Sequence, residues 1–507
     1  MQKEKLKKLI VPLIMLIAEL FLFFQMVSSK PNITIKYKVM FLVICILSNL
    51  VAYVLVKVIN KYKKIKLENI FLGIAISFGF LYLIFIPAIL GTDELPHFLR
   101  PYQISVGDVI VKHPEKNETQ IPKDLGSFVG EKDMSKRYSK ERILKSVDYS
   151  DTESLWNGDV TSIRYSPVSY IPQVIGFWLS RLFGLSPLLT LFLVRFCNFS
   201  VWLAISYFAF KLLPIKKTFA LLLYTAPSVL SIVSTCSYDA LALSLMLLLI
   251  AYILNIIKYK KSITKKDFLI LLLISLGIST YKVFYIIYIL LLLIIPKECY
   301  KNKKQKITYT LLILILSFLL DFGWYAVSMA SSVTGSSVIT EQLKFILMHP
   351  IKYLFIFINT YVNDIFYYVT NVIAGSEMCY GLARINQLFV LIYLGLLISS
   401  YFVEKNNIEL KKSSKFLIAF VCLAIFALVS TTLYLEWTAN KSGIGASKII
   451  GIQSRYFVCL IIPFILLLPK PKKILKNSKK IICFSILLNS LMFIDCIKSL
   501  LLNLFNV

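Results

Sequence analysis

The stretch that decides the fold is NIFLGIAISFGFLYLIFIPAILGTDELPHFLR, residues 69–100. Its longer first part carries no charged side chain, and an uncharged apolar run of about 18 or more residues is typical of a helix that spans a membrane. The stretch ends in a group of ionisable side chains, Asp93, Glu94, His97 and Arg100. The sequence therefore predicts a spanning helix that delivers this group to one face of a membrane.

The rest of the chain repeats this pattern of long apolar runs. Of its 507 residues 58% are hydrophobic, and the mean hydropathy is +0.75. The first run follows MQKEKLKKLI and lacks a small-residue cleavage site, so we expect it to remain as the first span and not to be removed as a signal peptide. These features predict an all-α, polytopic membrane protein.

The formal net charge of +29 is carried largely by short lysine-rich segments between the apolar runs. An excess of lysine and arginine is typical of cytoplasmic loops, which can also contact anionic lipid headgroups. On a soluble surface such a charge would indicate nucleic acid, but this distribution excludes nucleic acid as the expected partner. The segments are MQKEKLKK (1–8), KVINKYKKIK (57–66), KLLPIKK (211–217), KYKKSITKK (258–266), KECYKNKKQK (297–306), EKNNIELKKSSK (404–415) and KPKKILKNSKK (470–480).

If every lysine-rich segment is cytoplasmic, the N-terminus is inside and the chain crosses the membrane about thirteen times. We divide it into N-terminal spans (1–90), a long first extracytoplasmic loop (91–187) and a helical core (188–507). Segment 166–184 begins with two prolines and is expected to re-enter the membrane or lie along its surface. Segment 344–380 is aromatic and interrupted, which predicts an outer hairpin or a re-entrant structure. The expected spans are 9–27, 38–58, 69–90, 188–211, 218–236, 239–257, 267–280, 282–296, 307–328, 385–403, 416–435, 453–469 and 481–503.

Cysteine and histidine give no sign of a metal centre or a disulfide framework. The nine cysteines lie mostly inside apolar runs without paired spacing, as small buried hydrophobic residues do. Three histidines scattered over the chain do not form a metal-ligand pattern. We therefore expect no cofactor, and the sequence does not indicate a metal site, although it leaves a divalent metal open.

This topology places the unusual polar residues near apolar runs on the outer face. Ionisable groups at membrane depth are costly and usually functional. Their gathering at one face predicts a single extracytoplasmic site. The residues are Asp93, Glu94, Tyr165, Tyr170, Asp239, Lys282, Gln453 and Arg455.

The acidic segment is expected to begin a helix at the outer surface, with Thr92 as its N-cap. Asp93, His97 and Arg100 are then spaced i, i+4 and i+7, which places them on one helix face. A carboxylate held there can accept a proton from a hydroxyl group. The alternative is an acid that only stabilises the helix start, with a solvated histidine and arginine beside it.

Three further charged residues allow both a structural and a functional interpretation. Lys282 lies between two apolar runs and either extends to lipid phosphates or binds an anion in a cavity. Arg455 begins a span, and its guanidinium suits a phosphate group better than an ammonium does. Asp239 begins an apolar helix, and it either belongs to the site or serves only to stabilise the positive end of the helix dipole.

Five segments in order resemble the bacterial membrane family known as domain of unknown function 2142. They cover most of the chain between about residue 91 and residue 460. The chain departs from the family in two ways. Ser454 stands where the family has glycine. Two spans precede the span before the acidic segment, whereas many relatives have no earlier span. The matching segments are TDELPHFLRPYQISVGD, YSPVSYIPQVIG with LVRFCN, SYDALALS, TYKVFYIIY and GIQSRYF.

That family is similar to glycosyltransferases of the C-type (GT-C) fold, in which an acidic pair in an early outer loop serves catalysis. The resemblance implies Asp93 as the general base, with Glu94 supporting it, and a polyprenyl-phosphate sugar as the donor. Its motif positions imply a set of substrate-binding residues: His97, Arg100, Tyr165, Tyr170, Gln173, Asp239, Lys282, Tyr285, Gln453, Arg455 and Tyr456.

The expected function is therefore transfer of a sugar, with inversion, from a polyprenyl-phosphate donor to a cell-surface glycan or a lipid-linked acceptor on the outer face of the cell membrane. Two alternatives remain open. One is a flippase or transporter for a lipid-linked glycan, and the other is a polymerase or ligase of surface polysaccharide. A transporter should show charges along a path through the membrane, whereas here they gather at one face.

Overall fold

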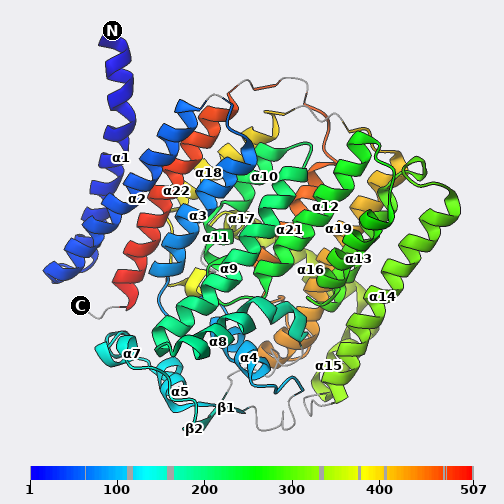
Figure 1. The fold of residues 1–507 in the computed structure, drawn as a ribbon, viewed down its shortest axis with the longest axis horizontal. Coiled ribbons are helices and arrows are strands. Elements are labelled where there is room, and N and C mark those ends of the chain that lie inside the picture. The colour runs from blue at the N-terminus through cyan, green and yellow to red at the C-terminus, as the bar shows by residue number, and fades with distance from the viewer. Residues whose placement is uncertain are drawn as a thin grey trace.

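The computed structural model describes most of the chain, and nearly all of its elements are helices (Figure 1). The described residues are 2–62, 64–110, 118–156, 165–330, 336–374, 378–404, 408–471, 474–475 and 477–504.

Among the described residues, eight helices are long and apolar enough to cross a membrane, and a bent helix pair makes nine if it is one span. Each has at least 18 residues, which at 1.5 Å per residue approaches the roughly 30 Å of a bilayer core. The chain is thus a multi-pass membrane protein, as predicted. These helices are α1 (Gln2–Ser29), α2 (Ile35–Lys61), α3 (Leu67–Phe85), α9 (Pro187–Leu212), α12 (Asp239–Tyr259), α14 (Lys303–Ala330), α19 (Lys412–Leu433) and α22 (Ser478–Leu504).

The other expected spans correspond to shorter or broken helices. Pro227 separates α10 from α11, because proline has no N–H to continue the helix. η4 is a 3-10 helix, whose rise of about 2.0 Å per residue makes a 12-residue segment roughly 24 Å long. The predicted count of about thirteen depends on whether these shorter helices also cross. They are α10 (Lys217–Tyr224) with α11 (Pro227–Val233), α13 (Lys265–Ser279), η4 (Val283–Ile294), α18 (Gln387–Tyr401), and η8 (Ser454–Phe457) with α21 (Val458–Ile465).

The interrupted segment around residues 344–380 is a bent pair of helices. α15 (Ser336–Met348) and α16 (Pro350–Asn363) meet at an angle of 102°, which makes them a broken span or a re-entrant loop. α17 (Ile365–Asn371) follows, and the short helix η6 (Met378–Gly381) comes later in the chain. This geometry agrees with the interruption expected from the sequence.

The segment between α3 and α9 forms a cap of short elements at one end of the bundle (Figure 1). β1 and β2 form a two-stranded antiparallel sheet in which Glu118 pairs with Trp156, an exception to the predicted all-α fold. α8 has 13 residues and spans about 20 Å, so it is too short to cross and lies at this end beside α4. The elements are α4 (Glu94–Ser105), β1 (Glu118–Pro122), α5 (Lys123–Gly130), α6 (Met134–Arg137), α7 (Lys140–Leu144), β2 (Thr152–Trp156), η3 (Pro167–Tyr170) and α8 (Ile171–Phe183).

The lysine-rich loops meet at the end of the bundle opposite the cap, which is the upper end in Figure 1. The ammonium group of Lys216 donates to the carbonyl oxygen of Tyr401 at 2.6 Å, and Lys479 donates to the carbonyl oxygen of Ile59 at 3.4 Å. These contacts join loops that are far apart in the sequence. The bundle therefore has one lysine-rich end and one end that carries the cap and the acidic segment.

Candidate functional site

A tight turn places Asp93 at the end of the bundle that carries the cap. Asp93 has a φ angle of 57° and a ψ angle of 21°, in the left-handed region that aspartate tolerates better than most residues. The expectation that Thr92 caps the helix is wrong, because Asp93 occupies the N-cap position and makes no side-chain cap bond. Glu94 accepts the N–H of Gly91 instead, at 3.0 Å. Backbone strain of this kind clusters at functional sites.

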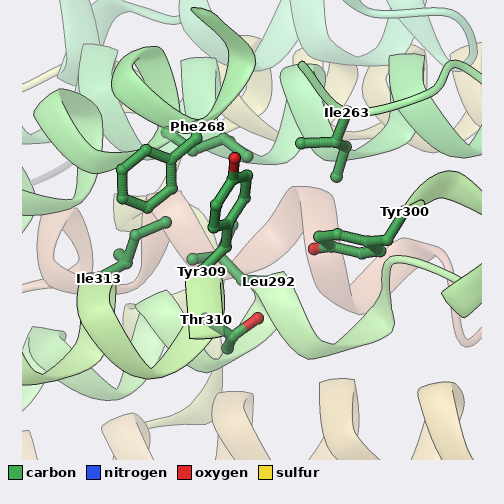
Figure 2. Close-up of a pocket in the computed structure, with 8 residues that line it drawn as sticks. Ile263, Phe268, Leu292, Tyr300, Tyr309, Thr310 and Ile313 are labelled. Carbon is green, nitrogen blue, oxygen red and sulfur yellow. The ribbon is translucent and has the colours of Figure 1, made fainter. Parts of the chain in front are cut away.

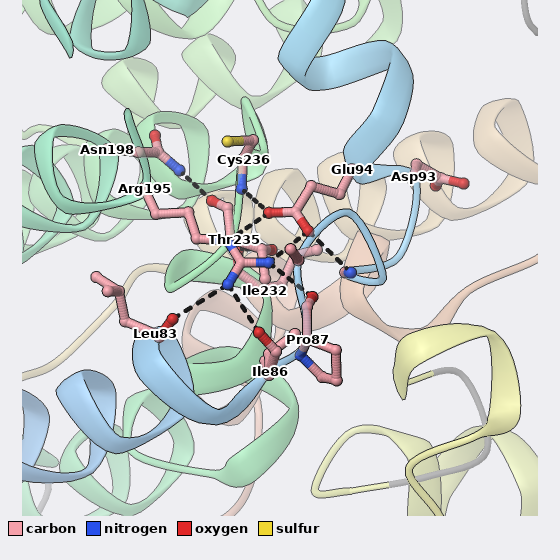
Figure 3. A network of polar contacts seen from close by, with 12 residues as sticks. Leu83, Ile86, Pro87, Asp93, Glu94, Arg195, Asn198, Ile232, Thr235 and Cys236 are labelled. Carbon is pink, nitrogen blue, oxygen red and sulfur yellow. Dashed lines mark hydrogen bonds and ion pairs between the residues drawn. The ribbon is translucent and has the colours of Figure 1, made fainter. Parts of the chain in front are cut away.

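The carboxylate of Glu94 is fully buried in an ion pair with Arg195 (Figure 3). Nε of Arg195 donates to Oε1 at 2.7 Å, and Nη2 donates to Oε2 at 2.6 Å. The N–H groups of Gly91 and Cys236 each donate to one of the two oxygens at 3.0 Å. Each carboxylate oxygen of Glu94 therefore accepts two hydrogen bonds from the protein.

Arg195 joins this ion pair to the end of α3. Its terminal nitrogens donate to the carbonyl oxygens of Leu83, Ile86 and Pro87 at 3.1, 2.8 and 3.0 Å. A buried charge needs such a complete set of partners, since an unpaired one is strongly destabilising. The pair thereby fixes the acidic segment to α9 and α3, and Figure 3 shows the Asp93 side chain directed away from it. Glu94 therefore fixes the turn, whereas the carboxylate of Asp93 takes no part in this buried ion pair.

Arg455 bridges two carboxylates from distant parts of the chain. Its Nη2 lies 2.5 Å from Oδ2 of Asp93, and its Nε lies 3.2 Å from Oδ2 of Asp239. The other oxygen of Asp239 accepts the hydroxyl of Tyr281. The Asp93 side chain is 36% exposed, whereas that of Asp239 is 3% exposed. Asp93 is therefore the acid that a solute can reach.

Lys282 lies beside this ion-pair cluster against aromatic rings. Its Nζ is 3.7 Å from the centroid of the Tyr456 ring, and it also faces Tyr281 and Tyr238 at 5.5 and 5.8 Å. Within the described part of the chain, no hydrogen bond or ion pair from this ammonium group is seen. A cation held over rings retains its donors for an incoming anion.

A cluster of aromatic rings adjoins the two acids. Tyr165 stacks on Tyr238 with 4.5 Å between centroids, and the His97 ring lies 4.6 Å from that of Tyr238. Nδ1 of His97 and the hydroxyl of Tyr170 are 2.7 Å apart. Burial lowers the pKa of His97 to about 4, so the imidazole is neutral near pH 7. His97 can thus orient a polar group but cannot neutralise an anion.

Two of the predicted residues, Tyr285 and Gln173, make hydrogen bonds to segments that carry residues of the site. The hydroxyl of Tyr285 donates to the carbonyl oxygen of Tyr456 at 2.6 Å. The amide of Gln173 donates to the side chain of Asn198 at 2.9 Å and to the carbonyl oxygen of Ser237 at 3.2 Å. Both bonds fix segments that carry cluster residues, so these side chains position the site.

Arg100 and Gln453 stand apart from the ion-pair cluster. The guanidinium of Arg100 donates to the carbonyl oxygens of Val109 at 2.7 Å and Asp108 at 3.3 Å, where it closes the end of α4. The sequence predicts that Arg100 lies on the same helix face as Asp93, near the acids. The guanidinium instead binds these two carbonyl groups and does not reach the acids. Gln453 begins η8, and its buried amide oxygen has no hydrogen-bond partner among the described residues.

Several residues at the site were not predicted from the sequence. Arg195 lies in the middle of an apolar run, and a charge at that depth is a signal that could have identified it. Tyr281 directly precedes Lys282, and this position beside a predicted site residue could have identified it. Tyr238 and Tyr380 follow no spacing that distinguishes them from the many core tyrosines.

The charges of the ion-pair cluster and of Lys282 beside it balance. Asp93 and Asp239 are offset by Arg455 and Lys282. Among the described residues, no group of three or more histidine, cysteine, aspartate or glutamate side chains could hold a metal ion. The arrangement can accept a proton at Asp93 and bind an anion beside Lys282.

A small pocket lies elsewhere, between α13, η4 and α14 (Figure 2). It belongs to the lysine-rich end, because the N–H of Ile263 in its wall donates to the carbonyl oxygen of Cys299 at 2.7 Å. Its wall contains no acid and no cation, so it is separate from the charged site. The lining residues are Ile263, Phe268, Leu271, Leu292, Tyr300, Tyr309, Thr310 and Ile313.

Comparison with known proteins gives a family and no assigned activity. The family model described as predicted membrane protein, domain of unknown function 2142, matches residues 76–465. No curated protein and no solved structure matches the chain. The matched region contains the acidic segment, Arg195, Asp239, Lys282 and Arg455, and it covers most of the sequence. The chain therefore belongs to the DUF2142 family of predicted membrane proteins.

Proposed function

We propose that this protein is an inverting glycosyltransferase of the GT-C type. It transfers a sugar from a polyprenyl-phosphate donor to a cell-surface glycan or a lipid-linked acceptor on the extracytoplasmic face of the cell membrane. The observation that carries the proposal is the meeting of a reachable acid, Asp93, with Arg455 and Lys282 at the end of the bundle opposite the lysine-rich loops.

The donor phosphate is proposed to bind at Lys282 and Arg455. The ammonium group of Lys282 has its donors available, and the guanidinium of Arg455 has a planar donor geometry that suits phosphate. A phosphate that draws Arg455 toward itself weakens the ion pair with Asp93, while Asp239 retains its bonds to Arg455 and Tyr281. The carboxylate of Asp93 is then released from Arg455 and can face the acceptor hydroxyl while the donor is present.

The proposed reaction is a single displacement at the anomeric carbon. The acceptor hydroxyl transfers its proton to the carboxylate of Asp93, and its oxygen forms the new glycosidic bond. The bond between the anomeric carbon and the phosphate oxygen breaks, and polyprenyl phosphate leaves toward Lys282 and Arg455. Positively charged groups held ready for the developing phosphate charge are the largest source of rate enhancement at such a site.

The membrane topology in this proposal has about thirteen crossings and a cytoplasmic N-terminus. The broken and shorter helices α10 with α11, α13, η4, α18 and α21 cross in addition to the eight long ones. Support comes from the lysine-rich loops, which connect these helices at the end of the bundle away from the acids. With this orientation the site faces outward, where the sugar must arrive already activated on its lipid.

The charged residues favour a transferase over a flippase for lipid-linked glycans. The ion-pair cluster of Asp93, Arg455 and Asp239, with Lys282 beside it, lies at one end of the bundle, whereas a transporter needs charged groups along a path through the membrane. The buried pair of Glu94 and Arg195 is saturated with protein partners, so it does not supply such a path.

Purified protein given a polyprenyl-phosphate sugar and a panel of acceptors would test the proposal. Lys282→Ala and Arg455→Ala should each raise the KM for the donor roughly ten- to hundred-fold, because each removes a charge-assisted contact to phosphate. Lys132→Ala is the matched control, since Lys132 is an exposed lysine of the same cap. If both variants used the donor as well as wild type, Lys282 and Arg455 would not bind phosphate, and the proposal would lose its main support.

A further inference from the structure

Tyr380 approaches Asp93 from a strained turn that lies more than 280 residues further along the chain. Cys379 and Tyr380 both have left-handed backbone angles, with φ values of 49° and 55°. Each such conformation costs a residue other than glycine about 1–2 kcal/mol. Two in succession persist only where the surrounding structure imposes them, and strain of this kind marks functional positions.

α22 imposes the turn. The N–H of Asn386 donates to Oδ2 of Asp495 at 2.6 Å, and the N–H of Arg384 donates to the hydroxyl of Ser499 at 3.0 Å. The Ser499 hydroxyl in turn donates to the carbonyl oxygen of Leu382 at 2.8 Å. These bonds hold the segment that follows Tyr380, from Leu382 to Asn386, against α22. The spanning helix α22 therefore sets the position of the Tyr380 side chain.

The Tyr380 hydroxyl touches the proposed base and still has its proton to donate. It accepts the N–H of Asp93 at 2.7 Å. Among the residues that the structure describes, none accepts a hydrogen bond from this hydroxyl, and the residue is 56% exposed. Partial desolvation and the nearby Asp93 charge raise the pKa of Tyr380 to about 12, so the phenol remains a donor at neutral pH.

We propose that Tyr380 is an acceptor-binding residue whose hydroxyl donates a hydrogen bond to a saccharide hydroxyl next to the one that Asp93 deprotonates. The inference rests on the proposed glycosyl transfer and names the residue that selects its acceptor. A hydroxyl-bearing sugar fits this position, because one of its hydroxyls can give its proton to Asp93 while the adjacent oxygen accepts a hydrogen bond from Tyr380. An acceptor without a neighbouring hydroxyl would lose this contact.

The first test measures saccharide binding to the full-length protein in lipid nanodiscs. The probes are methyl glycosides of glucose, galactose and N-acetylglucosamine, and binding is followed by saturation-transfer NMR. Tyr380→Phe should weaken binding about three- to ten-fold, the effect of one neutral hydrogen bond. Tyr367→Phe, at an exposed tyrosine of α17, should change nothing. Equal binding by Tyr380→Phe and wild type, or no binding of any probe by wild type, would overturn the inference.

The second test separates donation from a structural role. Replacing Tyr380 with 3,5-difluorotyrosine lowers the phenol pKa, so the group loses its proton at a lower pH while its oxygen still accepts the Asp93 N–H. Saccharide binding by this variant should fall as the pH rises through a range where wild type is constant. A flat profile would show that Tyr380 only supports the turn. Donor turnover measured in parallel identifies failure of the proposed transferase function separately, because saccharide binding does not require the donor.

Discussion

Asp93 and Glu94 are consecutive in the chain, yet their carboxylates lie in different surroundings. Glu94 is enclosed by Arg195 and two backbone N–H groups, whereas Asp93 is partly exposed beside Arg455. Neighbouring residues at the start of a helix point in different directions, so adjacent acids need not share a task. The sequence identified the pair, but the left-handed turn that separates them depends on Arg195, about a hundred residues later.

The division of tasks predicts that Glu94→Gln lowers stability more than Asp93→Asn does. A neutral side chain leaves Arg195 as an uncompensated buried charge, which costs about 3–5 kcal/mol. Thermal unfolding of the detergent-purified variants would measure the difference. A second substitution, Arg195→Gln, should restore part of the loss by removing the unpaired charge. An unchanged unfolding temperature for Glu94→Gln would contradict the assigned supporting role.

At the scale of elements, the length of the uncharged apolar runs predicted the long spans, but it did not predict local geometry. The 3-10 form of η4 and the strand pairing of β1 with β2 have no signal in the apolar pattern, because both depend on neighbours in space. Prolines did indicate the short helix α8, which packs along α9. Gly176 allows this approach, since a Cβ at that position would lie 2.7 Å from Cα of Val194.

We expect Gly176→Ala to force α8 away from α9 and to lower stability by about 1–3 kcal/mol, as overpacking does. α8 begins directly after Tyr170, so activity should fall as well. Gly395→Ala in α18 is the matched control, because no atom lies within 4 Å of an added Cβ there. Thermal unfolding and turnover of both variants would decide it. Equal stability of the two would show that the close contact between α8 and α9 does not matter.

At the scale of the whole molecule, the lysine distribution predicted which loops share an end of the bundle. It could not predict which polar residues meet, because the site is built from segments that are distant in the sequence and come together only on folding. α1, α2 and about half of α3 precede the family region, and α22 follows it. α2 and α22 are joined by a hydrogen bond between the hydroxyls of Ser48 and Ser490 at 2.8 Å. α22 also supports Tyr380, so a helix outside the family region contributes to the site.

Cysteine labelling of intact cells would test the orientation of the molecule. In a variant without the native cysteines, a cysteine at exposed position 130 in α5 should react with an impermeant reagent from outside. A cysteine at exposed position 301 in a lysine-rich loop should react only after the membrane is opened. The opposite pattern would place the acids in the cytoplasm and exclude an outer-face transferase.

The most direct test of the central claim is the activity of Asp93→Asn with a polyprenyl-phosphate sugar and an acceptor that wild type uses. The asparagine keeps the size of the side chain and removes its basicity. Because loss of a general base typically costs about 10²–10⁴-fold in rate, transfer should nearly vanish while the protein still folds and inserts into the membrane. Transfer at a near-normal rate by Asp93→Asn would contradict the account and leave Asp93 as an acid that only begins a helix.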